Sequence, residues 1–466
     1  MTKHNRYFFC GIGGSGMLPL ALILLGHGHS IEGSDRSLDQ GRTPAKFDYL
    51  RSLGIRLFPQ DGSGVTSPEQ IVVASAAVED TVPDIAAAIR VGAQRMSRAD
   101  MLSALFNAAP FAIGVAGTSG KSTITGMIAW ILHHAGKSPT VMNGAVMKNF
   151  RTPEALFSSS LVGTSGLFVS EVDESDGSIA AYNPRVAVLM NIALDHKTMD
   201  ELRALFGGFA ARAQDVVLNL DNAETARLAA DFPAAITYSL DNPAARLTAR
   251  NIVPAPTSIT CSVHDRKSGV SADIHLATPG RHNVSNALAA IAAVSTCGVT
   301  LDEAARALAE FSGIARRFDI VGTANGVTVI DDFGHNPDKI AATLRTVNQF
   351  PGRVLVMFQP HGFGPIKKMR REFAECFAEN LKAEDILLMP EPAYFGGTVD
   401  RSVGSADLAA DIRALGKSAE ALGDRAACGA RLVELAKPGD RILVMGARDD
   451  TLTTFAQDLL AALKAR

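Results

Sequence analysis

Gly114-Val115-Ala116-Gly117-Thr118-Ser119-Gly120-Lys121-Ser122-Thr123 lies between an apolar run, 111–116, and an amphipathic stretch that starts at Ile124. This order predicts a strand, a glycine-rich turn and a helix, so that backbone N–H groups converge at the helix N-terminus. Lys121 can hold a phosphate there and a hydroxyl can hold Mg²⁺, so the stretch predicts a nucleoside triphosphate site. The alternative is a plain connecting loop, because Val115 stands where the general phosphate-loop pattern has its first glycine.

Length and composition bound the class of protein. At 466 residues the chain exceeds what one hydrophobic core usually supports, so about two to four domains are expected. Hydrophobic residues make up 47%, charged residues 20%, and the formal net charge is -3, as in an ordinary soluble protein. This balance indicates no bulk attraction to nucleic acid or to an anionic membrane.

Two features of the sequence favour a cytoplasmic protein. The longest apolar run near the N-terminus, Met17 to Leu25, is too short to span a bilayer and follows a glycine loop instead of a basic leader. The five cysteines are scattered and never show C-x-x-C spacing. We therefore expect no membrane insertion, and reduced thiols that are mostly buried.

The N-terminal segment carries a second glycine-rich loop. Gly11-Ile12-Gly13-Gly14-Ser15-Gly16 follows the apolar run Tyr7 to Cys10 and precedes a helical stretch from Met17. A second predicted strand ends at Asp35, so strand, glycine loop, helix and acidic residue occur in the order of a dinucleotide-binding βαβ unit. We expect this loop to bind a diphosphate, and the alternative is a tight turn without a ligand.

Strands and helices alternate along the chain and predict three α/β segments, residues 1–108, 109–315 and 316–466. The predicted strands of the last two segments are 111–116, 167–170, 186–190, 216–219, 327–331, 354–358, 386–389 and 442–446. Alternation of this kind favours parallel, doubly wound sheets in every segment.

Acidic and imidazole side chains follow two predicted strands of the middle segment. Glu171-Val-Asp173-Glu174-Ser-Asp176 comes after the strand 167–170, and His196 comes soon after the strand 186–190. Ligands of open α/β sheets bind at the carboxyl ends of strands. Carboxylates there can hold Mg²⁺ against the β- and γ-phosphates. An acidic surface turn and a capped helix start are the alternatives.

Taken together, these motifs resemble the Mur ligase family, the ATP-dependent amide-forming enzymes that build the peptide stem of peptidoglycan. Gly117–Thr123 fits the family's Gly-Thr-x-Gly-Lys-[Ser/Thr]-Thr loop, and four further segments look like its L-alanine-adding branch: Gly11–Met17, Gly33–Asp35, Val72–Asp80 and Glu171–Asp176. The resemblance implies three α/β domains with mostly parallel, doubly wound sheets. These are a Rossmann-like UDP-binding domain, a P-loop ATPase domain and a Rossmann-like C-terminal domain.

The resemblance also implies roles for individual residues. The catalytic residues would be Lys121, Glu171, His196, Arg317 and His335. The Mg²⁺ ligands would be Ser122, Glu171 and His196. The UDP-sugar would be bound by Gly11, Gly13, Gly14, Ser15, Gly16 and Asp35. ATP would be bound by Gly117, Thr118, Ser119, Gly120, Lys121, Ser122, Thr123, His282, Asn283, Arg317 and Asp332.

The implied enzyme is an ATP-dependent acid–amino-acid ligase. A carboxylate does not condense with an amine in water, so ATP first converts it to an acyl phosphate, which the amine then attacks. The expected substrates are UDP-N-acetylmuramate and L-alanine, with ATP and Mg²⁺ as cofactors, in a monomer or homodimer. Residues of all three domains must meet, so we expect domain closure with a hinge near 315–320.

The identity of the amine stays open. In the L-alanine-adding branch, the motif that Phe358–His361 resembles continues with arginine, an aromatic residue, threonine and arginine, whereas here it continues with Gly362-Phe363-Gly364-Pro365. An amino-acid carboxylate is ordinarily met by such a bidentate cation. The replacement would come from Lys367, Lys368, Arg370 or Arg371. Otherwise the amine differs, as in ligation of a recycled murein tripeptide or another amine to UDP-N-acetylmuramate or a related acid. A remote alternative is an NAD-dependent oxidoreductase that uses the first glycine loop.

Overall fold

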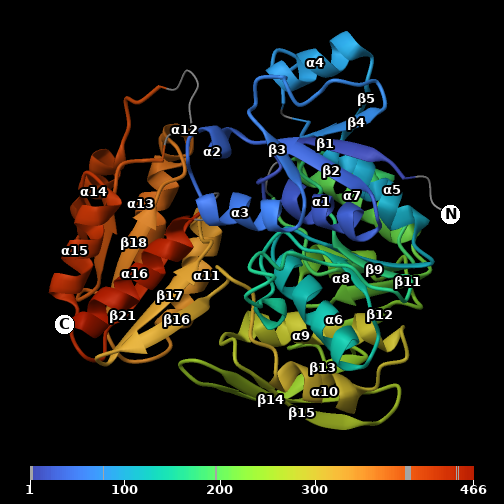
Figure 1. Ribbon diagram of the computed structural model, residues 1–466. Coiled ribbons are helices and arrows are strands. Elements are labelled where there is room, and N and C mark those ends of the chain that lie inside the picture. The colour runs from blue at the N-terminus through green and yellow to red at the C-terminus, as the bar shows by residue number, and fades with distance from the viewer. Residues whose placement is uncertain (1–3, 77, 195–196, 394–399, 448, 450) are drawn as a thin grey trace. The chain divides into compact units, whose positions relative to one another are not determined.

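The computed structural model describes residues 4–76, 78–194, 197–393, 400–447, 449 and 451–466. These residues fold into three β-sheets with flanking helices (Figure 1). The chain divides into two compact units, the first containing residues 1–254, 259–277 and 281–314, and the second residues 255–258, 278–280 and 315–466. Within the described ranges, no helix is long and apolar enough to cross a membrane.

The first sheet has five parallel strands in the order β3-β2-β1-β4-β5. They are β1 (Arg6–Cys10), β2 (Ser30–Ser34), β3 (Arg56–Phe58), β4 (Gln70–Ala74) and β5 (Gln94–Ser97). The helices are α1 (Met17–Gly26), α2 (Arg36–Asp39), α3 (Pro44–Ser52), α4 (Pro83–Val91) and α5 (Arg98–Ala108). The strand order switches direction at β1, and the loop Gly11–Gly16 leaves β1 there, where sheets of this kind bind ligands.

The second sheet has ten strands in the order β15-β14-β13-β12-β11-β10-β6-β9-β7-β8. They are β6 (Phe111–Ala116), β7 (Thr140–Met142), β8 (Ser160–Leu161), β9 (Leu167–Glu171), β10 (Val186–Leu189), β11 (Asp215–Asn219), β12 (Ile236–Ser239), β13 (Leu247–Pro254), β14 (Ile259–Asp265) and β15 (Ser271–Leu276). The helices are α6 (Lys121–His134), α7 (Met199–Ala211), α8 (Ala223–Leu228), α9 (Arg281–Ser295) and α10 (Leu301–Ala309), with short 3-10 turns at Lys148–Phe150 and Ser178–Ala181. The parallel part, from β7 to β13, includes β6, and Gly117–Thr123 follows its carboxyl end.

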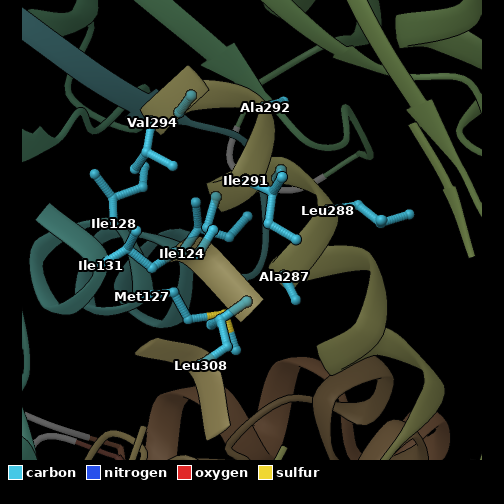
Figure 2. Close-up of a cluster of buried hydrophobic side chains, with 14 of the residues drawn as sticks. Ile124, Met127, Ile128, Ile131, Ala287, Leu288, Ile291, Ala292, Val294 and Leu308 are labelled. Atoms are coloured by element: carbon cyan, nitrogen blue, oxygen red, sulfur yellow. The ribbon is translucent and has the colours of Figure 1, made fainter. Parts of the chain in front are cut away.

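Helix α6 is buried on nearly all sides. Its apolar side chains pack against α9 and α10, and Figure 2 shows this core with Met127, Ile291 and Leu308 among the labelled residues. Trp130, the only tryptophan of the chain, is partly buried on the same helix. Its indole Nε1–H donates to the carbonyl of Ala307 at 2.7 Å. The helix that begins at the phosphate loop is therefore packed into the core from its first turn to Leu132.

One apolar core joins the first two sheets. It contains residues of β1, α1 and α5 together with residues of β6, β9, β10 and α7. The ring of Phe106 lies 5.8 Å from that of Phe168 and 5.2 Å from that of Tyr182, both in edge-to-face geometry, which favours aromatic pairs. The shared core explains why residues 1–314 form most of a single compact unit.

The second unit is built on a six-stranded sheet in the order β16-β17-β21-β18-β19-β20. Its strands are β16 (Asp319–Ala324), β17 (Val327–Asp332), β18 (Val354–Gln359), β19 (Ile386–Met389), β20 (Ser418–Ala421) and β21 (Arg441–Gly446). Its helices are α11 (Pro337–Val347), α12 (Phe363–Lys368), α13 (Arg370–Asn380), α14 (Ser405–Ala414), α15 (Arg425–Leu435) and α16 (Thr451–Ala465). Alternate residues of β18 pack into two different cores, one with α11, α13 and α14 and the other with α15 and α16. The sheet is therefore covered on both faces, as expected for a doubly wound fold.

The α/β class and the mostly parallel sheets expected from the sequence are confirmed, and every strand predicted in the last two segments is present. The expectation of parallel pairing throughout is wrong at the sheet edges. The pairs β7–β8, β13–β14, β14–β15 and β16–β17 are antiparallel. Asn325-Gly326 joins β16 to β17 with positive φ at both residues, the geometry of a two-residue hairpin turn.

Candidate active site

Asp35 shapes the glycine loop of the first sheet. Its buried carboxylate accepts the N–H of Gly13 at 2.8 Å and the N–H of Ser37, at the start of α2, at 2.7 Å. A Cβ on Gly13 would lie 3.0 Å from Asp35 Oδ2, which is closer than most Cβ contacts, so the glycine favours the close approach of the carboxylate. The predicted pair of glycine loop and acidic residue is therefore brought together, with Asp35 bound to the loop itself.

Only some N–H groups of the loop Gly11–Gly16 are open to a ligand. Those from Gly11 to Gly14 donate within the chain, to the Ser34 carbonyl, the Asp35 carboxylate and a loop carbonyl, at 2.8 to 3.1 Å. Among the described residues, the N–H groups of Ser15 and Gly16 meet no acceptor in the chain. The part of the predicted diphosphate site with open donors is thus the end of the loop, where α1 begins.

The phosphate loop ends at an uncapped helix. Gly120 is the N-cap of α6 and no side chain caps this end. Its φ of 98° and the φ of 148° at Gly117 lie in the region that favours glycine, and a Cβ on Gly117 would lie 2.6 Å from Met190. Within the described ranges, the N–H groups of Lys121 to Thr123 meet no acceptor in the chain. Such a helix end binds anions, because its N–H groups and its dipole favour negative charge.

Two asparagines that the sequence analysis did not assign lie against this loop. The Asn191 side chain, just beyond β10, accepts from the N–H of Ser119 at 2.9 Å and donates to its carbonyl at 2.9 Å. The Asn286 side chain lies beside Gly120, where an added Cβ would approach its Oδ1 to 3.1 Å. The signal for Asn191 was its place directly after a strand that ends at the site.

Lys121 is paired with a carboxylate of the acidic segment. Its Nζ donates to the carbonyl of Gly117 at 2.8 Å and to Glu174 Oε2 at 3.0 Å. The Lys121 side chain is 18% exposed and that of Glu174 5%. Burial works against the ammonium, but the nearby carboxylates, Glu174 foremost, outweigh it and raise the pKa of Lys121 above its usual value. The lysine is therefore charged at neutral pH.

Glu171 lies at the edge of the sheet where the phosphate loop begins. The register of β6 and β9 pairs it with Val115, and its Oε1 accepts the N–H of Gly144 at 2.6 Å. His196, the other predicted Mg²⁺ ligand from a strand end, lies outside the described residues. In the part of the chain that the structure describes, no three His, Cys, Asp or Glu side chains form a metal-binding group.

Two of the residues predicted to bind ATP, His282 and Asn283, lie at the start of α9. His282 is exposed, whereas Asn283 is buried and its Oδ1 accepts from Asn286 Nδ2 at 3.1 Å. Because Asn286 itself lies beside Gly120, Asn283 belongs to the same network as the phosphate loop.

In the second unit, Asp332 organises the carboxyl end of β17. Its carboxylate accepts from the N–H of Phe318 at 2.8 Å, the N–H of Gly334 at 2.8 Å and Thr343 Oγ1 at 3.0 Å. The guanidinium of Arg317 lies 4.3 Å from the centre of the Phe333 ring, in the same segment. The two residues predicted to contact ATP from this unit therefore lie near one strand end.

His335 lies in the same segment and is held neutral. Its Nδ1–H donates to the Phe333 carbonyl at 3.0 Å, and its ring lies 5.4 Å from that of His361. Burial, followed by the nearby cation of Lys339, lowers the pKa of His335 to about 3. Because the one N–H of the neutral ring is on Nδ1, Nε2 can only accept a hydrogen bond from a reacting group.

The low pKa of His335 predicts a pH effect on stability. Because the folded state binds this proton less tightly than the unfolded state, stabilisation is full above the ordinary pKa of 6.5 and is lost as the pH falls toward about 3. We expect wild type to lose more unfolding free energy between pH 7.5 and 5 than His335→Gln, as measured by urea denaturation. Equal losses would show that the imidazole is not shielded from protonation.

The basic residues after His361 are largely paired with acidic residues. Lys367 pairs with Asp400, Arg371 with Glu375 at 2.7 Å, and Arg370 with Asp411 through Nη2 at 2.8 Å. Three of the four cations suggested as carboxylate ligands thus have acidic partners. A further guanidinium, that of Arg401, lies 5.6 Å from the centre of the ring of Phe363, the residue that follows Gly362.

Comparisons with known proteins match the chain along most of its length. Three family models cover it in succession: Mur ligase family, catalytic domain, at residues 6–109; Mur ligase middle domain, at 115–294; and Mur ligase, glutamate ligase domain, at 316–448. A UDP-N-acetylmuramate–L-alanine ligase of Synechococcus sp. (strain JA-3-3Ab) is 37% identical over 389 residues, 82% of this chain and 72% of that protein. The chain belongs to the Mur ligase family. These matches confirm the resemblance noted from the sequence. The enzymes of this family are ATP-dependent.

Solved structures agree with this assignment. The UDP-N-acetylmuramate–alanine ligase MurC of Thermotoga maritima superposes with a TM-score of 0.81 at 26% identity, covering 99% of this Mur ligase and 100% of that chain. A murein peptide ligase of Psychrobacter arcticus gives a TM-score of 0.70 at 26% identity, with 99% of both chains covered.

Proposed function

We propose that this Mur ligase joins L-alanine to UDP-N-acetylmuramate in an ATP-dependent reaction of peptidoglycan synthesis. The observation that carries the proposal is the match, over nearly the whole chain, to enzymes named for that activity. The open N–H groups at the starts of α1 and α6 support it, because the reaction needs one site for a diphosphate and one for a triphosphate.

The chemistry is phosphoryl transfer followed by acyl transfer. A carboxylate oxygen of the sugar nucleotide attacks the γ-phosphorus and the bond to ADP breaks, which leaves an acyl phosphate. The amine nitrogen then attacks the acyl carbon and loses a proton, and phosphate departs with the electrons of the carbon–oxygen bond. Lys121 would neutralise the charge that develops on the phosphoryl oxygens, with Arg317 as the second cation.

Mg²⁺ fits the oxygen donors beside the phosphate loop. Glu171 uses one carboxylate oxygen to accept from Gly144, and Ser122 lies in the first turn of α6. Mg²⁺ usually binds one or two carboxylates together with substrate phosphates and water, so this site needs no three-residue metal cluster. When bound there, the ion would neutralise phosphate charge.

Glu171→Ala tests the metal site. We expect the Mg²⁺ concentration for half-maximal activity to rise at least about tenfold, because a ligand of the ion is lost. Phosphate release measured across a Mg²⁺ titration gives this value, and Glu69→Ala, an exposed glutamate before β4, is the control. An unchanged titration would remove Glu171 from the metal site.

A second candidate function is ligation of a murein tripeptide to UDP-N-acetylmuramate. It is favoured by Gly362 and Pro365, which stand where the L-alanine-adding branch carries arginines, and by the likeness to a murein peptide ligase. A peptide places its carboxylates elsewhere than L-alanine does, so it does not need those arginines.

One assay distinguishes the two candidates. Phosphate release is measured with ATP, Mg²⁺ and UDP-N-acetylmuramate, offering L-alanine, glycine, L-serine and L-Ala-D-Glu-diaminopimelate separately, and each amide is confirmed by mass spectrometry. Turnover with L-alanine supports the first proposal, and turnover with the tripeptide alone supports the second. Silence with all four would contradict both.

A further inference from the structure

Arg98 places a guanidinium on the glycine loop of the first sheet. It is the first residue of α5, directly after β5, and this helix is fixed by the Ser97 hydroxyl, which accepts from the N–H of Asp100 at 3.0 Å. A Cβ on Gly16 would lie 3.0 Å from Cδ of Arg98 and 3.1 Å from its Nη1. The φ of Gly16 is -98°, which any residue adopts. A side chain at position 16 would therefore press on Arg98, whose side chain occupies the space beside this glycine.

The guanidinium lies where the loop leaves hydrogen-bond donors open. In the described part of the chain, the N–H groups of Ser15 and Gly16 have no acceptor, and α1 begins directly afterward with no side-chain cap and no acidic residue in its first turn. Two open N–H groups and the start of a helix thus lie at the end of this loop, and the guanidinium of Arg98 lies beside Gly16. Arginine binds phosphate oxygens through two parallel hydrogen bonds.

The partner of Arg98 in the chain is the acidic segment of the second sheet. Its Nη2 lies 3.8 Å from Asp176 Oδ2, and the two side chains are 26% and 35% exposed. This separation is too long for a hydrogen bond, so the ion pair leaves N–H donors of the guanidinium for a ligand. The same segment holds Glu174, the partner of Lys121 in the phosphate loop.

We propose that Arg98 binds the diphosphate of the sugar nucleotide, and that its ion pair with Asp176 links this loop to the acidic segment beside the phosphate loop. The proposal rests on the proposed function in that it takes the sugar nucleotide as the ligand of the first sheet. Binding of a diphosphate draws the guanidinium from Asp176. Asp176 and the diphosphate therefore compete for one cation.

The test is equilibrium binding of UDP and of uridine to the whole enzyme without ATP, by calorimetry. Arg98→Ala should weaken UDP binding about 10- to 100-fold, the value of charge-assisted hydrogen bonds, and leave uridine binding unchanged. Arg98→Lys should fall between, because it keeps the charge but not the planar fork. Arg51→Ala, which removes an exposed arginine of α3 paired with Asp48, is the matched control and should bind UDP as wild type does.

A second variant tests whether Asp176 and the diphosphate compete for Arg98. Asp176→Asn should tighten UDP binding by a few-fold, the size expected for an exposed ion pair. Wild-type affinity in Asp176→Asn would remove the link to the acidic segment.

The outcomes separate this proposal from the ligase activity. Wild-type affinity for UDP in Arg98→Ala, or an equal loss of UDP and uridine binding, would overturn the role of Arg98, whatever amine the enzyme uses. If the wild-type enzyme binds UDP but forms no amide, the proposed role of Arg98 is still supported and the proposed ligase activity is contradicted. If the wild-type enzyme does not bind UDP, both proposals are contradicted. Thermal denaturation of each variant shows whether it is folded, and Arg98→Lys carries the test if the alanine variant is not.

Discussion

Replacing Lys121 with alanine is expected to lower ATP-dependent product formation at least about 100-fold, the cost of removing one group that stabilises charge in a transition state. The ammonium is held at the start of α6 by the Gly117 carbonyl and Glu174, beside N–H groups that no acceptor in the described chain occupies. Its raised pKa keeps the charge at all working pH values. The assay is phosphate release together with the mass of the amide. Lys267→Ala, at an exposed turn between β14 and β15, is the control.

The same substitution leaves the buried Glu174 without its cation, so loss of activity alone could reflect partial unfolding. Breaking a buried ion pair by removing one partner costs roughly 3 kcal/mol or more. The double variant Lys121→Ala, Glu174→Gln removes both charges and should regain most of that stability in urea denaturation, yet remain inactive. Activity in either variant would contradict the assignment of Lys121.

Arg316→Ala is expected to destabilise the second unit by roughly 3 to 5 kcal/mol. Arg316 is buried, with Nε 3.4 Å from Asp331 Oδ1, and it donates to the carbonyl of Asp449 at 3.0 Å and to that of Gly446. Asp331 has no exposed surface, so truncation leaves two carbonyls without this donor and a buried carboxylate without its cation, although Thr453 Oγ1 still donates to that carboxylate at 3.0 Å. The free energy of unfolding from urea titration measures the effect.

A matched control for Arg316→Ala lies in the same unit. Arg371 is 84% exposed and pairs with Glu375 one helical turn away, so Arg371→Ala should cost only about 0.5 kcal/mol. Adding Asp331→Asn to Arg316→Ala should recover part of the loss, because no unpaired charge is then buried. Equal effects of Arg316→Ala and Arg371→Ala would show that the buried network does not stabilise the unit.

Much of the fold followed from local sequence. The strands and the two glycine loops were predicted because apolar runs and glycines fix their own conformation at short range. Asn325-Gly326 is a strong signal for a hairpin turn, but the prediction of parallel sheets from the alternation of helices and strands did not include it.

The site was predicted less completely, because side-chain neighbours depend on packing between distant segments. The sequence places Arg316 and Arg317 side by side, and only the structure shows that both guanidinium groups lie over the Phe333 ring and that Arg316 is buried beside Asp331. Arg98 and Gly16 are far apart in the chain, so no local sequence motif predicts that they lie side by side. The roles predicted for His196 concern a residue outside those described.

Trp130 gives the enzyme an optical reporter that is confined to one of its two units. It is the only tryptophan in the chain and sits on the helix that begins with Lys121. Its emission follows the unfolding of the first unit, whereas circular dichroism in the far ultraviolet follows the helices of both units. A variant that weakens only the second unit, such as Arg316→Ala, should therefore lose ellipticity at a lower urea concentration than the one at which its fluorescence changes.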